Sequence, residues 1–491
     1  MHATSSSRCN AVSFLVVALI LVAGCAPVRQ RELAATATAQ ADLVERGLLP
    51  AVRVAGRHYA PATIAERLHE YGVPAATIAV IDGGAVVWAR AYGTADMASG
   101  RAATTSTLFQ AASMSKPVAS TAALQLVQEG ILALDAPVNE RLRSWQIPEN
   151  PFTAGHTVTL RHLLTHTSGL TVSGFSGYRA GASIPTVTQI LDGVPPANTP
   201  PVRVDTIPGS QLKYSGGGMT VVQLLLTDVT GKDFPTLMRE RVLDPVGMHS
   251  STWEQPLSDQ RARDASAGHQ TTGAPVDGMY HVYPELAAAG LWTTATDLAR
   301  WIQAIQRSLQ GEAGALLSRE TARTMVTAGL GGWGLGVQLM GSGDSLAFTH
   351  SGGNAGFRGL LVGFAEGGRG AVVMTNSDAG SRLVNEIMQS VARAYDWPAF
   401  RPTIIVPVDV TPEILRAYAG TYELAGGTRV RVAVEGSALW LTLPWGERRE
   451  LILTGEDEFG SPEGGFGRFL RDRLGLVSAL VLGDDQLQRV Q

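Results

Sequence analysis

The spacing of hydrophobic and polar residues changes along the chain, and the first changes predict a helix followed by a β-hairpin. Residues 62–71 place Ile64 and Leu68 on one side of a helix. Two short apolar runs follow at residues 75–82 and 85–93, and an Asp-Gly-Gly turn separates them. Two adjacent strands joined by such a turn are the usual form of an antiparallel pair.

Helical spacing returns between Met114 and Glu129. Pro117 falls in the first turn of this segment, where its missing N–H costs nothing, and Gly130 stands where a helix commonly ends. A polar side chain just before this segment, such as that of Ser113, therefore lies at the N-terminus of a predicted helix.

The centre of the chain, residues 139–250, is predicted to be mostly helical with Pro- and Gly-rich loops. Beyond it the pattern predicts two more helices and, between them, four strands. The helices cover residues 298–309 and 382–395, and the strands cover 334–340, 346–350, 359–365 and 371–376. Strands at both ends of a domain with helices between them indicate an α+β fold.

A proline-rich stretch at residues 396–412 separates this part from a strand-only part. Short alternating or apolar runs at 420–424, 429–436, 438–444 and 450–455 predict a small all-β domain over residues 411–491. The first domain is expected to cover residues 57–399.

Composition narrows the classes of partner. The 491 residues carry a formal net charge of −4, with acidic and basic residues interspersed. Because nucleic-acid binding requires a concentrated positive surface, we expect no nucleic-acid partner.

The N-terminus has the features of an export signal. Arg8 precedes an apolar stretch at residues 11–23, and Val-Ala-Gly leads to Cys25, which resembles the lipidation site of bacterial lipoproteins. We expect a signal peptide at 1–25, a lipid on Cys25, a tether at 26–56 and a location at the periplasmic face of the cell envelope. An ordinary export signal with an incidental cysteine is the alternative, and either leaves no pair of cysteines for an internal disulfide.

Lys116 is one of three lysines in a chain whose other basic residues are arginines. Arginine cannot release its proton in a protein, whereas a desolvated lysine can act as a base. Ser113 lies one helical turn before Lys116, so the amine can reach the hydroxyl. Ser210 and Lys213 have the same spacing, although their surroundings predict a loop.

Two later motifs favour Ser113 and Lys116 over Ser210 and Lys213 as the catalytic pair. They are Tyr214-Ser215-Gly216 and His350-Ser351-Gly352-Gly353. With "LFQAASMSK" and "VTLRHLLTHTSGL", they make residues 57–399 resemble the penicillin-recognising serine hydrolases. The resembling branch contains class C β-lactamases, DD-carboxypeptidases, D-aminopeptidases and β-lactamase-like carboxylesterases. It implies a three-layer fold in which helices flank an antiparallel sheet, and the C-terminal part resembles the lipocalin-like modules of some relatives.

The resemblance also implies roles for these residues. Ser113 would attack a carbonyl carbon, and Lys116 would accept its proton, alone or through Tyr214, which would pass it to the leaving group. The backbone N–H groups of Ser113 and Gly353 would form the oxyanion hole. His350, where many relatives have lysine, would bind a substrate carboxylate when protonated or hold Tyr214 when neutral. Substrate contacts are expected at Ser215, Gly216, Ser351 and Gly352.

The second motif departs from the usual pattern, because Gly216 stands where relatives often have an asparagine that binds the substrate's acyl-side carbonyl. This change favours small esters or unusual amides. The expected function is acyl-enzyme hydrolysis of a small-molecule or peptide substrate, in first place a D-amino-acid-containing peptide. A carboxylesterase, a weak β-lactamase and a non-catalytic penicillin-binding sensor are the alternatives.

No cofactor or metal is expected. His162 and His166 have the i, i+4 spacing of a helical zinc pair, but the adjacent glutamate of the zincin motif and a third ligand are missing. The oligomeric state is left open.

Overall fold

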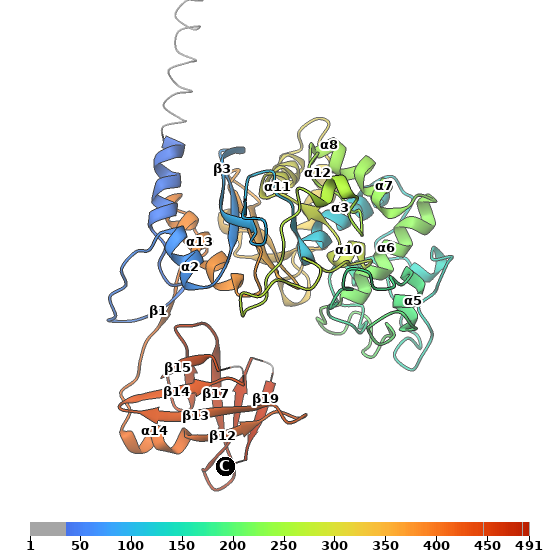
Figure 1. Ribbon diagram of the computed structural model, residues 1–491. Coiled ribbons are helices and arrows are strands. Elements are labelled where there is room, and N and C mark those ends of the chain that lie inside the picture. Colours follow the sequence, from blue (N-terminus) through green and yellow to red (C-terminus); the bar gives the residue numbers. More distant parts are fainter. Residues whose placement is uncertain (1–35, 445, 484, 491) are drawn as a thin grey trace, which may run out of the picture.

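The computed structural model describes residues 36–444, 446–483 and 485–490, which form a large α+β domain and a separate β-barrel (Figure 1). The expected signal peptide and Cys25 lie outside the described residues. Within the described part of the chain, no helix has both the length and the apolar character needed to cross a bilayer.

The centre of the large domain is a seven-stranded antiparallel sheet, with strand order β4-β3-β2-β10-β9-β8-β7. Strands from both ends of the domain therefore meet in one sheet, as the sequence pattern predicts. The strands are β2 (Ala75–Asp82), β3 (Ala85–Asp96), β4 (Arg101–Ala102), β7 (Gln338–Met340), β8 (Ala347–Asn354), β9 (Phe357–Phe364) and β10 (Gly370–Thr375).

Strand β2 shows why the central strands are apolar throughout. Ala79 and Ile81 belong to the core on one face of the sheet, whereas Ile78 and Val80 belong to the core on the other face. Successive side chains of a strand point to opposite faces, so a strand that is covered on both faces needs apolar residues at every position.

Helices cover both faces of this sheet (Figure 1). Helix α11 packs on β2, β9 and β10, and α13 packs on the same sheet from the other core, with α2 beside it. This arrangement confirms the α+β fold that the sequence pattern predicts and the three layers that the family resemblance implies. Besides a helical segment at residues 36–46, the α-helices of the described chain are α2 (Ile64–Glu70), α3 (Ser115–Gln128), α4 (Leu160–Leu164), α5 (Val187–Asp192), α6 (Gly216–Thr230), α7 (Phe234–Met238), α8 (Asp244–Val246), α9 (Asp259–Ala262), α10 (Leu286–Ala289), α11 (Ala295–Gln310), α12 (Arg319–Met325), α13 (Gly380–Ala394) and α14 (Pro412–Tyr418).

The middle of the chain is less helical than its sequence predicts. Residues 143–158 and 171–186 contain neither α-helix nor extended strand. In such loops, hydrogen bonds from side chains replace the backbone hydrogen bonds of a helix. For example, Asp228 accepts hydrogen bonds from the backbone N–H groups of Arg143 and Ser144. The prolines and glycines of this region explain the difference, because they interrupt the backbone ladder of a helix.

Part of the segment expected to be a tether packs on the domain. Residues 36–46 are helical, and the side chains of Ala41 and Val44 are wholly buried in the core that contains α13. Glu45 accepts hydrogen bonds from Arg90 and from the hydroxyl of Tyr92. The physical reason is the apolar spacing of Ala41, Val44 and Leu48, which gives this helix a face to bury. From residue 36 onward the segment is therefore structural.

The C-terminal domain is a closed barrel of eight antiparallel strands, β12 to β19. Its interior is filled by side chains such as those of Tyr422, Phe459 and Phe469, so the barrel has a packed core. Its strands are β12 (Gly420–Glu423), β13 (Arg429–Glu435), β14 (Ala438–Thr442), β15 (Arg448–Leu453), β16 (Glu458–Gly460), β17 (Phe466–Arg471), β18 (Val477–Leu482) and β19 (Asp485–Arg489).

Two kinds of contact join the barrel to the large domain. Strand β1 (Val52–Val54) pairs in parallel with β11 (Thr403–Ile405), and Val54 and Ile405 pack against Ile452 of the barrel. Beside this apolar contact, the guanidinium of Arg57 donates two hydrogen bonds to the carboxylate of Glu450, at 2.7 and 2.6 Å.

Candidate active site

Ser113 lies in a tight turn that enters α3. The 3₁₀ turn η1 (Ala112–Met114) precedes the helix, and Ala112 has a φ of 50°, in the left-handed region that alanine rarely adopts. Strand β8 approaches this turn backbone to backbone, because an ideal Cβ on Gly352 would lie 2.3 Å from the carbonyl oxygen of Ala111. Strain of this kind, held by surrounding structure, is typical of functional sites.

The amine of Lys116 is aimed at this serine. Its Nζ lies 2.9 Å from the Oγ of Ser113 and donates a second hydrogen bond, at 2.7 Å, to the carbonyl oxygen of Ala288 in α10. The Lys116 side chain is buried, with 2% of its surface exposed, while Ser113 is half-buried. The structure thus brings together the pair that the first Ser-x-x-Lys match predicts.

The second Ser-x-x-Lys match has a different environment. Ser210 donates from its hydroxyl to the carbonyl oxygen of Ile207 at 2.6 Å, and Lys213 forms an ion pair with Asp205 near the surface. These residues lie in a loop, as their sequence context predicts.

Tyr214 lies against the Lys116 amine. The residue stands two positions before α6, is half-buried, and has its ring centroid 5.1 Å from the Nζ of Lys116. The lysine amine therefore lies over the tyrosine ring, and the proton-carrying role that the resemblance implies for the Tyr214 hydroxyl stays a prediction.

His350 is neutral in the folded protein. It lies on β8, and its Nδ1–H donates to the carbonyl oxygen of Ser351 at 2.6 Å. Burial, together with the positive charge of Lys116, lowers the pKa of His350 to about 3. Its ring centroid lies 6.2 Å from that of Tyr214. At neutral pH this residue therefore offers no positive charge to a substrate carboxylate.

The other residues of the third motif continue β8 past the turn of Ser113. Ser351 is exposed, Gly352 is buried against the residue before the turn, and Gly353 pairs with Arg358 of β9. The strand thus extends four residues beyond the expected end at His350, and Gly353, the expected oxyanion donor, follows directly after the residue that approaches the turn of Ser113.

Ser215 and Gly216 are placed differently from the expectation that they contact substrate. Ser215 is wholly buried, and its hydroxyl accepts from the N–H of Gly218 while donating to the carbonyl oxygen of Thr171. It therefore acts as the N-cap of α6. Gly216 is also buried, and a Cβ at this position would lie 2.9 Å from Cε2 of Phe175. The ring of Phe175 therefore occupies the space that the first atoms of an asparagine side chain would need.

The histidines of the possible zinc pair have separate surroundings. The ring nitrogen Nδ1 of His162 accepts from the N–H of Thr159 at the start of α4, and His166 contacts Tyr214. Among the described residues, no three His, Cys, Asp or Glu side chains are grouped so that they could hold a metal ion.

Sequence reasoning missed two groups of this site, the carbonyl of Ala288 and the ring of Phe175, and it considered His166 only as a possible zinc ligand. A backbone carbonyl leaves no signal in a sequence. Phe175 comes from an irregular loop whose path could not be predicted. His166 lies in the segment "LLTHTSGL", and that segment was the one available signal.

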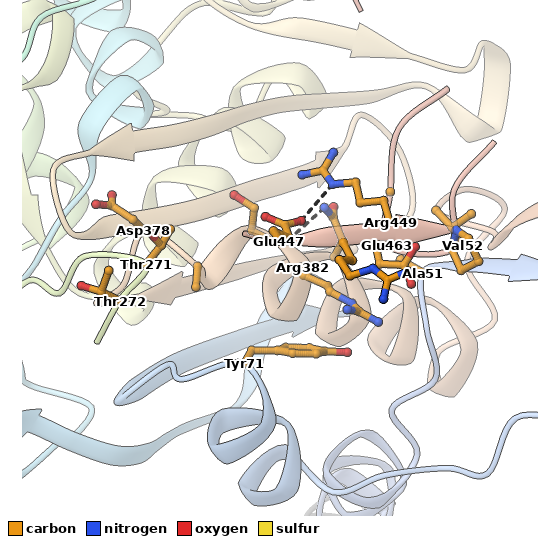
Figure 2. Close-up of a pocket in the computed structure, with 16 residues that line it drawn as sticks. Ala51, Val52, Tyr71, Thr271, Thr272, Asp378, Arg382, Glu447, Arg449 and Glu463 are labelled. Atoms are coloured by element: carbon orange, nitrogen blue, oxygen red, sulfur yellow. Dashed lines mark hydrogen bonds and ion pairs between the residues drawn. The ribbon is translucent and has the colours of Figure 1, made fainter. Parts of the chain in front are cut away.

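A cavity of about 1050 Å³ lies elsewhere, between the large domain and the barrel (Figure 2). Tyr71 and Arg382 line it from one side, and Glu447, Arg449 and Glu463 from the other. Ser113, Lys116 and Tyr214 are not among its lining residues. Catalysis requires a nucleophile and a base within hydrogen-bond reach of each other. Ser113 and Lys116 meet this requirement, so they identify the candidate site, whereas the volume of a cavity does not.

Comparison with known proteins agrees with this geometry. A family model described as Beta-lactamase matches residues 60–393. The chain belongs to this family. The matched residues contain Ser113, Lys116, Tyr214 and His350, and the family comprises serine hydrolases that include esterases, amidases and peptidases.

Curated relatives resemble the chain over different lengths. Penicillin-binding protein 4* of Bacillus subtilis is 25% identical over 446 residues, which cover 86% of this chain and 93% of that protein. Esterase EstB of Burkholderia gladioli is 29% identical over 280 residues, which cover 50% of this chain and 69% of that protein.

Solved structures resemble the chain over most of its length. The structure of SurE with D-Leu is 25% identical with a TM-score of 0.55, and covers 87% of this chain and 97% of that chain. An octameric penicillin-binding protein homologue from Pyrococcus abyssi is 21% identical with a TM-score of 0.57, over 86% of this chain and 98% of that one. The second likeness shows the fold alone.

Proposed function

We propose that the protein is a serine hydrolase that cleaves small amides or esters of D-amino acids through an acyl-enzyme on Ser113. The observation that carries this proposal is the 2.9 Å contact between the buried amine of Lys116 and the hydroxyl of Ser113. A nucleophile and a base within hydrogen-bond reach, with the base held by a third group, form the arrangement that nucleophilic catalysis requires.

In the proposed reaction, Oγ of Ser113 attacks the substrate carbonyl carbon while its proton passes to the amine of Lys116, directly or through Tyr214. The oxygen of the tetrahedral intermediate carries the negative charge and accepts from the N–H groups of Ser113 and Gly353. The same proton then moves to the leaving nitrogen or oxygen as its bond to carbon breaks. Water then attacks the acyl-enzyme carbonyl carbon as its proton passes to the amine of Lys116, and that proton moves to Oγ of Ser113 as the acyl–Oγ bond breaks, which frees the acid and restores Ser113.

The substrate class rests on two supports. Penicillin-binding protein 4* resembles 86% of the chain, and SurE, solved with D-Leu, resembles 87% of it. Within that class, neutral His350 favours amide or aminopeptidase substrates over carboxypeptidase substrates, because it supplies no charge for a free carboxylate.

A carboxylesterase is the second candidate, and one observation favours it. The place of the asparagine that would bind an amide carbonyl is taken by Gly216 and the ring of Phe175. EstB, which resembles half of the chain, is an esterase. An ester needs no such contact, since its leaving group departs more easily than an amine.

The proposed location is the periplasmic face of the cell envelope, with the protein anchored by a lipid on Cys25. The lipoprotein-like signal in the sequence supports this location. The full-length protein should partition into the detergent phase when it is expressed in bacteria, and Cys25→Ala should move it to the aqueous phase. Detergent partitioning of Cys25→Ala would contradict the anchor.

The experiment that tests the function is intact-mass analysis with steady-state kinetics. The soluble protein is incubated with a D-amino-acid p-nitroanilide, a p-nitrophenyl ester and a penicillin, beside Ser113→Ala and the control Ser210→Ala. We expect an adduct or turnover in the wild type and in Ser210→Ala, and neither in Ser113→Ala. Faster turnover of the anilide would favour a hydrolase of D-amino-acid amides, and faster turnover of the ester would favour a carboxylesterase. Turnover of the penicillin alone would identify a β-lactamase, and acylation without turnover a sensor.

A further inference from the structure

Tyr214 is bracketed by two hydrogen bonds to one histidine. The carbonyl oxygen of His166 accepts from the N–H of Lys213 at 2.7 Å, and its ring nitrogen Nδ1 accepts from the N–H of Ser215 at 3.3 Å. Since these donors stand directly before and after Tyr214, the two bonds fix the backbone on both sides of it.

The imidazole of His166 also fixes the ring of Tyr214. The two ring centroids are 4.3 Å apart at 42°, and Trp333 lies edge-on to the imidazole at 4.6 Å. Trp333 also contacts the ring of His350, at 5.5 Å between centroids. The tyrosine therefore lies in a packed group of four rings, beside the amine of Lys116.

The backbone conformation of His166 indicates that the fold holds this group of rings in one defined arrangement. Its φ is 54°, in the left-handed region, which histidine adopts more readily than branched residues do but still uncommonly. Its side chain is wholly buried. An uncommon backbone conformation held by buried contacts is a feature of functional sites.

The hydrogen bonds also define which nitrogen carries the proton. Because Nδ1 of His166 accepts, its proton is on Nε2, and that N–H is buried with no partner in the described part of the chain. His350 is the reverse case, since its Nδ1 donates and its Nε2 is a buried acceptor, also without a described partner. Burial above all, and then the charge of Lys116, lower the pKa of His166 well below its usual value, so this neutral form persists.

We propose that His166 is a positioning residue that holds Tyr214 in the orientation needed to give a proton to the leaving group. The proposal rests on the proposed function, because the proton-carrying role of Tyr214 belongs to it. His166 itself does not touch the reacting atoms; it acts through the Lys213–Ser215 backbone and the tyrosine ring.

The leaving group provides the test, because p-nitroaniline needs a proton to depart and p-nitrophenolate does not. His166→Asn keeps an acceptor near the Nδ1 position and tolerates the left-handed backbone, but it lacks the ring. We expect kcat for a D-amino-acid p-nitroanilide to fall about 10- to 100-fold, within the usual range of acid–base effects, with KM changed less than about threefold. For the p-nitrophenyl ester we expect a loss of less than about threefold.

His162→Asn is the matched control, since it makes the same change one turn earlier, and it should leave both rates unchanged. A second variant, His166→Gly, adopts the left-handed backbone without strain and leaves space for free imidazole. Added imidazole should restore its anilide activity in a saturable way, and should not affect His162→Gly.

The outcomes separate this proposal from the proposed function. Wild-type protein without Ser113-dependent turnover would contradict the function. If the wild type turns over, equal losses on anilide and ester, or unchanged anilide activity in folded His166→Asn, would overturn only the role of His166. Failure of both His166 variants to fold, with or without imidazole, would show that the residue is structural and would also overturn it.

Discussion

The carbonyl oxygen of Ala288 accepts a hydrogen bond from Nζ of Lys116 at 2.7 Å. This carbonyl belongs to the last turn of α10, where helix carbonyls have no partner inside the helix. The bond holds the amine with its Nζ 2.9 Å from the Oγ of Ser113. The carbonyl of Ala288 thus explains why the flexible side chain of Lys116 is held close to Ser113.

Lys116→Arg should keep the positive charge and abolish acylation. A guanidinium retains its proton at any pH at which the protein folds, so it cannot accept the serine proton. We expect the rate of adduct formation to fall at least about 100-fold, in line with the loss of a general base. Stopped-time intact-mass measurements with a penicillin or p-nitrophenyl ester provide the rate.

Lys232→Arg is the control for this substitution, because Lys232 is half-exposed and pairs only with Glu240 among the described contacts. It should acylate at the wild-type rate. Acylation of Lys116→Arg at that same rate would remove Lys116 from the proposed mechanism.

Gly216→Asn, which would restore the residue that relatives often have, should destabilise this protein. Its Cβ would lie 2.9 Å from Cε2 of Phe175 and 3.0 Å from the carbonyl oxygen of Ser173. Overpacking of this kind costs about 1–3 kcal/mol. Phe175→Ala should reduce that cost, so the double variant should be more stable than the sum of the two single effects predicts.

Thermal or urea unfolding of the four proteins in this cycle measures the coupling between Gly216 and Phe175. Exposed Gly174, beside Phe175, offers a control in Gly174→Ala, because a Cβ there meets no atom within 4 Å. Additive effects of Gly216→Asn and Phe175→Ala would show that the ring does not occupy the asparagine's place.

The parts of the molecule differ in how far the sequence predicts them. The sheet and its flanking helices follow from regular spacing, as in β2, whose two apolar faces each meet a layer of helices. The Ser113–Lys116 pair is predictable because both residues belong to one helical turn. Phe175 is not, since its position depends on an irregular loop between distant elements. The helix at residues 36–46 departs from the predicted tether, because the Ala-rich composition of the segment around it is also typical of linkers.

The stability of the interface between the two domains should depend more on Ile405 than on Arg57. The Arg57–Glu450 pair is half-exposed on the arginine side, and pairs of this kind contribute about 0–1 kcal/mol. Ile405 is 1% exposed between Val54 and Ile452, and truncation of such a side chain costs about 2–5 kcal/mol.

Limited proteolysis of the linker at residues 396–412 measures this difference. Ile405→Ala should be cleaved faster than wild type, and Arg57→Ala should resemble wild type. Ser113 should be acylated normally in both, because the site and its described contacts lie within the large domain. The reverse order of cleavage would show that the ion pair dominates the interface.

Glu285 should make the folded protein less stable as the pH rises. Its carboxyl group is wholly buried with no hydrogen-bond partner for either oxygen among the described residues. Burial raises its pKa from 4.5 to about 8. The folded state therefore keeps a proton that the unfolded state has already released.

The sign of the effect follows from that difference in bound protons. Between pH 4.5 and about 8 the folded state binds more protons than the unfolded state, so the free energy of unfolding falls with rising pH across this window. The stabilisation is complete below pH 4.5 and is lost once Glu285 ionises in the folded state. Glu285→Gln stays neutral, so it should gain stability relative to wild type by on the order of a few kcal/mol as pH rises from 5 to 8. Urea unfolding at several pH values measures this gain, with exposed Glu312→Gln as the control. A constant stability difference between wild type and Glu285→Gln across the window would show that Glu285 ionises at its ordinary pKa.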